Sequence, residues 1–226
     1  MDERTSGIAK GPSGLGQEAA SFIAGCPGAD LRDERGSQEA LRIWGRENGH
    51  VLTDSLFSRL ELVSNTTSEA EVFYNPADNR AWKRTWPGAF GFVPRKNSDS
   101  GWSASPALPS DLLWRLLLQN EIFLDDIRVE GIIESSGPSM IIGQRADGVS
   151  LVFSQPWIEA ENPCDPYPSE EQIGALMRGL GFAEIPASFY GWRHDDGTVV
   201  LDAKPDNFIK SETGIIPIDL QIMREF

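Results

Sequence analysis

Cysteine, histidine and long apolar runs are scarce in this sequence. Cys26 and Cys164 are the only cysteines among 226 residues, too few for a disulfide framework, so we interpret them as free thiols in a reducing cytoplasm. His50 and His194 stand at no metal-ligand spacing from them, which argues against zinc. No run of eighteen apolar residues predicts a transmembrane helix, and the opening MDERTSGIAKGPSGLGQ lacks the apolar segment of a secretory signal.

Basic charge is also in short supply. The chain carries 34 acidic and 20 basic side chains, for a formal net charge of −14. Such a charge repels nucleic acid and anionic membranes, so neither is expected as a partner. Hydrophobic residues make up 40% of the sequence, as in ordinary globular proteins, and the length allows a core within one large domain or two lobes.

The order of predicted elements indicates an α+β protein with two lobes. Residues 1–35, rich in Gly, Ser and charge, predict a flexible leader or part of a longer protein. Residues 36–160 predict an antiparallel sheet with one long helix, and residues 161–226 predict a smaller lobe, with the proline-rich NPCDPYP at the boundary. A long Gly/Pro/Ser-rich connection is expected from Pro87 to Pro109.

Three amphipathic helices are expected from apolar spacing and capping residues. They begin at Ser37, Ser110 and Ser169, each a plausible N-cap. Strands are expected near Leu60, in EVFYN and RAWKRT, in two or three runs ending near Phe153, and in SFYGWR and TVVLDA. The HDDG between the last two reads most simply as a hairpin turn.

Acidic and amide side chains stand at the ends of short strand-like runs near the C-terminus. Asp202 follows TVVL, Lys204 and Asn207 come next, and Asp219 follows IIPI. If the two strands pair, these side chains converge at one site. A carboxylate and an amide oxygen would suit Mg²⁺, and a second carboxylate could orient a hydroxyl or accept its proton.

These segments resemble the protein-kinase-like phosphotransferases. LDAKPDNFI resembles their catalytic loop, and IPIDLQ resembles their metal-binding segment. By this resemblance, Asp202 is the catalytic aspartate, Lys204 approaches the transferred phosphate, and Asn207 and Asp219 hold Mg²⁺.

Upstream segments extend the resemblance. RAWKRT resembles the strand whose lysine contacts the ATP phosphates, which implies Lys83, and LLLQNEIF resembles the helix that supplies the partner of that lysine, which implies Glu121. LVFSQPWIE resembles the hinge, so Ser154, Gln155 and Trp157 are implied as contacts of adenine.

From Gln38 to Ile222, the chain is most similar to the kinase-like domain of polyvalent proteins from phages and conjugative elements. The shared features are the LLLQNE helix, SQP at the hinge, a helix ending in GF, the loop with its Asp and Asn, and PID near the end. The resemblance implies a bilobal kinase-like fold with a reduced C-terminal lobe. It also implies ATP and Mg²⁺ as cofactors, and an unknown protein or small molecule as phosphoryl acceptor.

Some positions depart from the kinase pattern. SNTTSEAE, between the first strands, has no glycine to let backbone N–H groups approach phosphate, and Leu220 and Gln221 follow Asp219 where Phe and Gly are usual. The sequence ends at Phe226 without the helical subdomain that binds peptides, so a peptide acceptor is not favoured. A catalytically inactive pseudokinase, acting as a binding or regulatory module, is the alternative, and an effector that labels host macromolecules is a third.

Each candidate also has an ordinary structural interpretation on its own. Lys83 could be a solvated strand lysine and Glu121 a partner of a nearby arginine, while acids at strand ends often form turns. The functional interpretation requires the candidates to share one cleft, because the chemistry needs them together.

Overall fold

The computed structural model describes residues 12–25, 34–64, 69–97, 101–138, 145–186, 188 and 190–225. Its helices and strands mix without a parallel repeat, which places the protein in the α+β class. Of the two cysteines predicted to be free thiols, Cys26 lies outside the described residues, and Cys164 is exposed with a free thiol. None of the described helices is both long and apolar enough to cross a membrane.

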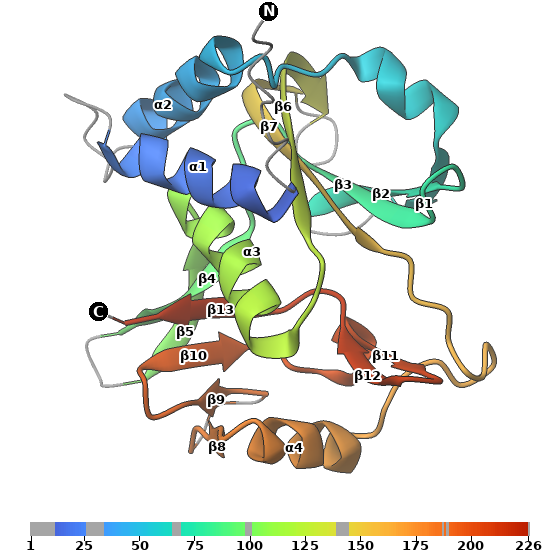
Figure 1. Cartoon of the computed structure of the whole chain (residues 1–226). Coiled ribbons are helices and arrows are strands. Elements are labelled where there is room, and N and C mark those ends of the chain that lie inside the picture. The colour runs from blue at the N-terminus through green and yellow to red at the C-terminus, as the bar shows by residue number, and fades with distance from the viewer. Residues whose placement is uncertain are drawn as a thin grey trace, which may run out of the picture.

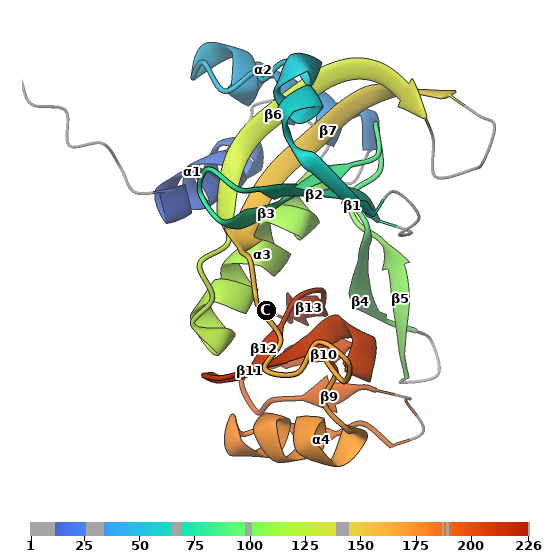
Figure 2. The ribbon, with the colours of Figure 1, turned by 90° about the vertical axis from the view of Figure 1, so that its right-hand side faces the viewer.

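An antiparallel five-stranded sheet forms one end of the molecule (Figures 1 and 2). The sequence predicted a strand in each of its five segments, and β3 is the central strand of the sheet. The order is β1 (Glu61–Ser64), β2 (Ala70–Asn75), β3 (Arg80–Thr85), β7 (Arg145–Pro156) and β6 (Arg128–Pro138).

The register of β3 and β7 decides which side chains share a face of this sheet. Lys83 lies opposite Phe153, and Ala81 lies opposite Gln155. Because side chains alternate between faces along a strand, these four point to one side of the sheet. Ser154, one residue along β7, points to the other side.

Three helices cover the sheet and enclose the larger apolar core. Helix α1 (Pro12–Gly25) packs on α3 (Pro109–Phe123) and β6, and α2 (Glu34–Glu47) lies beside α1 (Figure 1). Ala19 and Ala20 of α1 have no solvent exposure. Residues 12–25 are therefore helical and packed, contrary to the flexible leader that composition predicted, because small apolar residues on one face of α1 fit against α3.

A β-hairpin replaces the long irregular connection expected from Pro87 to Pro109. Strands β4 (Phe92–Lys96) and β5 (Trp102–Pro106) pair antiparallel, and β4 lies against β13. The two-stranded ribbon tolerates Pro94 and Pro106 because each strand has an edge that needs no N–H donor. Composition thus indicated a loop where tertiary contacts stabilise strands.

The other end of the molecule holds a smaller sheet and a helix, around a second apolar cluster (Figure 2). Its sheet order is β13-β10-β9-β8, and a separate hairpin pairs β11 with β12. The elements are α4 (Glu170–Gly179), β8 (Ala183–Glu184), β9 (Trp192–Arg193), β10 (Thr198–Leu201), the 3-10 helix η2 (Pro205–Asn207), β11 (Phe208–Ser211), β12 (Gly214–Pro217) and β13 (Gln221–Arg224). A further 3-10 helix, η1 (Asp54–Arg59), precedes β1.

Only one of the three expected N-caps is a cap. The Ser169 hydroxyl accepts from the Gln172 N–H, as predicted for the start of α4. Ser37 lies buried inside α2, which begins three residues earlier. Ser110 lies inside α3, where the Asp111 carboxylate instead accepts the Leu108 N–H at 3.0 Å, so the acid at the third helical position fixes the helix start.

Candidate functional site

A cleft of about 770 Å³ lies between the five-stranded sheet and the segments that follow β10 and β12. Its volume is within the range of about 300–1,000 Å³ that small-molecule sites usually occupy. Its lining residues are Val63, Ser64, Glu69, Val72, Ala81, Lys83, Gln155, Pro156, Trp157, Ile158, Tyr167, Asp202, Lys204, Asp206, Asn207, Ile209, Ile218, Asp219 and Gln221. Seven of the nine predicted site residues are among them; Glu121 and Ser154 are not.

Strand pairing explains why the C-terminal candidates converge. Strand β10 pairs antiparallel with β13, with Leu201 opposite Gln221. Asp202 follows the end of β10 directly, and Asp219 precedes the start of β13, so both acids stand at the same edge of the small sheet. The hairpin of β11 and β12 closes the loop between them, and the Ile218 N–H donates to the Asn207 carbonyl at 2.8 Å.

The loop after β10 is held by its own polar groups. The Asn207 amide Nδ2 donates to the Asp202 carbonyl at 2.7 Å and to Asp202 Oδ2 at 2.9 Å. Asp202 has φ of 58°, the left-handed conformation that costs a non-glycine residue energy and occurs often at functional sites. The amide therefore holds the aspartate in a fixed orientation at the cleft.

Lys204 lies beside this aspartate. Its Nζ is 3.5 Å from Asp202 Oδ1 and 3.7 Å from Asp206 Oδ2. Partial burial lowers the pKa of Lys204, but the two carboxylates raise it further, so the pKa lies above its usual value. Lys204 therefore stays positively charged at the mouth of the cleft.

Lys83 reaches from the sheet across to the opposite wall of the cleft. Its Nζ donates to the Ile218 carbonyl at 2.5 Å. Burial lowers the pKa of Lys83 below its usual value, while the nearby Asp219 and Glu69 carboxylates oppose that shift and Arg115 adds to it. The ammonium is thus desolvated, and it stands where an anionic ligand would gain most from it.

Sequence reasoning missed an ion-pair network behind Lys83. Arg115 of α3 donates to the Glu69 carboxylate and, through Nη2, to Asp219 Oδ1 at 2.5 Å. Burial lowers the pKa of Arg115, but Glu69 and Asp219 raise it further, and burial raises the pKa of Glu69. The apolar spacing of α3 could have indicated this network, because Arg115 interrupts its buried face between Leu112 and Leu116.

Glu121 is not the partner of Lys83, contrary to the expectation from LLLQNEIF. Its carboxylate accepts from Arg224 Nη2 at 2.9 Å, and it lines a different groove from the cleft. The helix period explains the difference: Arg115 and Gln119, four residues apart, line a small cavity behind the cleft, and Glu121 lies two residues further around α3. The acids near Lys83 come from Glu69, Asp219 and Asp125 instead.

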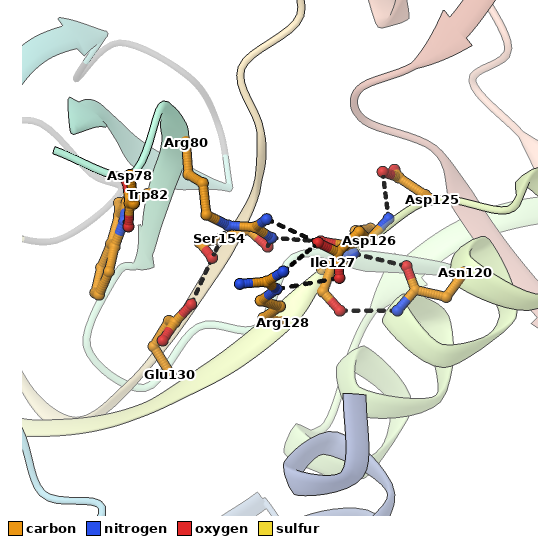
Figure 3. Close-up of polar contacts among 10 residues, drawn as sticks. All are labelled: Asp78, Arg80, Trp82, Asn120, Asp125, Asp126, Ile127, Arg128, Glu130 and Ser154. Atoms are coloured by element: carbon orange, nitrogen blue, oxygen red, sulfur yellow. Dashed lines mark hydrogen bonds and ion pairs between the residues drawn. The ribbon is translucent and has the colours of Figure 1, made fainter. Parts of the chain in front are cut away.

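Ser154 also lies away from the cleft. Its hydroxyl accepts from Arg80 Nε at 2.8 Å and donates to Glu130 at 2.5 Å, and Arg80 continues to Asp126 (Figure 3). This network ties the end of β7 to the segment after α3, where Asn120 bonds both backbone groups of Ile127. Ser154 therefore stabilises the linker, residues 155–158, on the side away from the cleft, and its side chain does not reach a ligand in the cleft.

Gln155 and Trp157 do line the cleft where the chain passes from one part of the molecule to the other. The Gln155 side chain is buried, and its Oε1 has no hydrogen-bond partner among the described residues. The Trp157 N–H is bonded to the Asn79 carbonyl at 3.0 Å, and its ring packs on Tyr74 with centroids 4.8 Å apart. The linker thus presents the unpaired amide oxygen of Gln155 and the aromatic side chain of Trp157 to the cleft.

Asn207 and Asp219, the two predicted metal ligands, each have a side-chain oxygen that is not used in the hydrogen bonds described above. Asn207 uses its Nδ2 toward Asp202, which directs its Oδ1 elsewhere, and Asp219 uses Oδ1 toward Arg115, with its side chain 42% exposed. No three Asp, Glu, His or Cys side chains gather as a metal site within the described ranges. Two protein oxygens fit Mg²⁺ that takes its other ligands from phosphate and water.

Comparisons of the chain with protein-family models, with curated proteins and with solved structures find no match. The residues of the cleft are therefore the basis for a functional proposal.

Proposed function

We propose that this protein binds a nucleoside triphosphate with Mg²⁺ and transfers the terminal phosphoryl group to an acceptor, as a kinase-like phosphotransferase with a small C-terminal lobe. One observation carries the proposal: a single cleft is lined by Lys83 of the large sheet and by Asp202, Lys204, Asn207 and Asp219 near the C-terminus. Unrelated surface charges would not gather in this way, and the set contains the cations, the carboxylate and the oxygen donors that phosphoryl transfer needs.

The side chains divide the work by position. Lys83, desolvated at the inner wall, would bind the phosphate oxygens and offset their charge. Asp202, fixed by the Asn207 amide, would accept a hydrogen bond from the incoming hydroxyl and orient it, while Lys204 beside it would bind the transferred group. Mg²⁺, held by Asn207 Oδ1 and Asp219, would supply positive charge to the phosphates when bound.

The apolar part of the cleft lining suits a flat base. Val72, Ala81, Ile209 and Ile218 give it apolar walls, and the aromatic rings of Trp157 and Tyr167 border it. Base stacking on aromatic side chains contributes about 1–3 kcal/mol in single-stranded nucleic-acid sites. The unpaired amide of Gln155 would supply hydrogen bonds to the polar edge of the base.

Calorimetric titration of the full chain with ATP, with and without Mg²⁺, tests the binding step. We expect binding that strengthens with Mg²⁺ and that weakens at least about tenfold in Asp219→Asn. Asp195→Asn, an exposed acid in the hairpin turn before β10, is the matched control and should bind as wild type. Absence of heat at millimolar ATP and Mg²⁺ would reject the proposal.

Release of phosphate from ATP to water tests the transfer step without a known acceptor. Asp202→Asn should keep nucleotide affinity but lower this slow hydrolysis by about 10²-fold or more, the usual effect of a positioned acid or base. Equal hydrolysis by the variant and the wild type would show that Asp202 takes no part in transfer.

A pseudokinase that binds or regulates without turnover is the second candidate. It is favoured by the internal pairing of the charges: Asp219 is bonded to Arg115 and Lys83 to the Ile218 carbonyl. Measurable nucleotide binding with no hydrolysis, and no change on Asp202→Asn, would support this candidate over the enzyme.

A further inference from the structure

Arg115 is a buried cation held on three sides. Its side chain is 5% exposed. Nη1 donates to the Glu69 carboxylate and to the Phe92 carbonyl at 3.2 Å, and Nη2 donates to Asp219 Oδ1 at 2.5 Å. A charge removed from water in this way is costly unless its partners are well placed, so the surrounding acceptors must hold the guanidinium in a fixed position.

The backbone makes room for this arrangement. Gly91 has φ of 73°, and a Cβ added there would lie 2.3 Å from Glu69 Oε2 and 3.1 Å from Arg115 Nη1. Any other residue at position 91 would displace the carboxylate that balances the guanidinium. The absence of a side chain at Gly91 therefore keeps Glu69 and Arg115 together at the start of β2.

Arg115 reaches the nucleotide cleft through the Asp219 and Glu69 carboxylates, which both line it. A small inner cavity of about 40 Å³ lies behind the cleft, and Lys83, Glu69, Gln155 and Asp219 line both spaces. Arg115 lines the inner cavity and is not part of the cleft wall. It is therefore too far back to be assigned a phosphate contact, and its effect on a bound ligand passes through these carboxylates, of which Asp219 is the candidate metal ligand.

We propose that Arg115 is the residue that positions Asp219 for metal binding: it holds Oδ1 and leaves Oδ2 free for the cation. This inference rests on the proposed nucleotide and Mg²⁺ site. The fork of the Arg115 guanidinium bridges the Glu69 and Asp219 carboxylates, with one nitrogen bonded to each. The charged bond to Oδ1 restrains rotation of the Asp219 side chain, so the aspartate loses less conformational freedom when it binds metal. Helix α3 thus supplies Arg115 to the candidate metal ligand Asp219. The sequence had predicted that this helix supplies Glu121 to Lys83.

Charge balance supports the assignment. Glu69 and Asp219 offer two negative charges, and Arg115 and Lys83 offer two positive charges. Arg115 is bonded to both carboxylates, whereas Lys83 is bonded to the neutral Ile218 carbonyl.

The test is the Mg²⁺ dependence of ATP binding, followed at fixed ATP while Mg²⁺ is varied. Arg115→Met removes the fork with little change in length, and we expect the Mg²⁺ concentration for half-saturation to rise at least about tenfold. Arg115→Lys keeps the positive charge without the fork, so its half-saturating Mg²⁺ concentration should lie between those of wild type and Arg115→Met. ATP binding without metal should stay within about twofold of wild type, a separation that a general structural defect would not produce.

A second variant keeps the test valid if Arg115→Met folds poorly because Glu69 is left unpaired. Glu69→Gln combined with Arg115→Met removes that carboxylate charge, and we expect recovered thermal stability with the same weakened Mg²⁺ dependence. Arg95→Met is the control, because Arg95 also pairs with an acid, Asp111, but lines no part of the cleft.

The outcomes separate this inference from the proposed function. Wild-type protein that binds ATP with Mg²⁺, together with variants of Arg115 whose Mg²⁺ dependence is unchanged, would overturn the inference alone. An equal loss of metal-free and metal-dependent binding would also overturn it, since Arg115 would then only support the fold. Wild-type protein that binds no nucleotide would reject the proposed function and the inference together.

Discussion

The Nζ atom of Lys83 lies 2.5 Å from the carbonyl oxygen of Ile218, the residue directly before Asp219. This hydrogen bond joins the central strand of the large sheet to the segment between β12 and β13. It also places the ammonium beside the candidate metal ligand. A phosphate oxygen is a stronger acceptor for an ammonium than a neutral carbonyl, so a nucleotide could take over this bond.

Replacement of Lys83 should remove most nucleotide binding. In Lys83→Met, the desolvated ammonium is lost, and we expect ATP affinity or phosphate release to fall by about 10²-fold, as when one preorganised charge is removed from an active site. Lys96→Met is the matched control, because Lys96 is an exposed strand lysine that lies outside the cleft. Loss in both variants, or in neither, would contradict a specific role for Lys83.

The depressed pKa of Lys83 predicts an alkaline loss of nucleotide affinity. Burial holds this pKa below the usual lysine value of 10.5, and only the protonated amine binds phosphate. Affinity should therefore stay constant while the pH is below the pKa of Lys83 and fall as the pH rises through it, before an ordinary lysine would lose its proton. Calorimetry between pH 7 and pH 10 measures this fall, and Lys83→Met should show none of it.

The same shift fixes the sign of a stability effect. The native state holds the Lys83 proton less tightly than the unfolded chain, so the lysine costs stability at neutral pH. That cost is relieved as the pH rises from the native pKa toward the unfolded value of about 10.4. Thermal unfolding should accordingly show Lys83→Met more stable than wild type at pH 7, by a margin that shrinks as the pH rises through the lowered native pKa of Lys83. A margin that grows with pH would mean that the amine is not desolvated.

Glu121 provides a test between the resemblance and the geometry. The resemblance to kinase-like proteins implies that Glu121→Gln disables the lysine, whereas its ion pair with Arg224 on the other side of α3 predicts unchanged nucleotide binding. Because Glu121 is exposed, we expect a stability loss of at most about 1 kcal/mol. ATP titration of this variant against wild type decides between the two, and a tenfold loss of affinity would favour the resemblance.

The sequence predicted the parts of the site that depend on local order. Asp202, Asn207 and Asp219 follow or precede short strands, and antiparallel pairing brings the ends of neighbouring strands together. Strand β3 was also predicted, because EVFYN and RAWKRT flank the turn-forming PADN. With β3 and the C-terminal strands predicted, a cleft shared by Lys83 and Asp219 was a direct expectation, and the structure has both residues in one cleft.

The sequence could not predict contacts set by the rotation of a helix or by distant packing. Which acid faces Lys83 depends on the angle at which α3 lies on the sheet, and a rotation by two residues separates Glu121 from the positions that line the small cavity behind the cleft. The partnership of Glu69 with Arg115 depends on the space that Gly91 leaves. The spacing of α3 marks Arg115 as a polar residue on a buried face, but spacing along the chain identifies neither its partner Glu69 nor the acids that face Lys83.

Helix α1 supplies the last prediction, because composition placed its residues in a flexible leader. Ala20 is fully buried in the larger core, while Ser21 beside it is exposed on the same helix. Ala20→Asp would bury a carboxylate without a partner, so we expect a loss of about 3 kcal/mol or more in the free energy of unfolding. Ser21→Asp should change that free energy by no more than about 0.5 kcal/mol. Urea unfolding of both variants measures the difference, and equal stabilities would mean that residues 12–25 do not pack on the protein in solution, as the composition alone predicted.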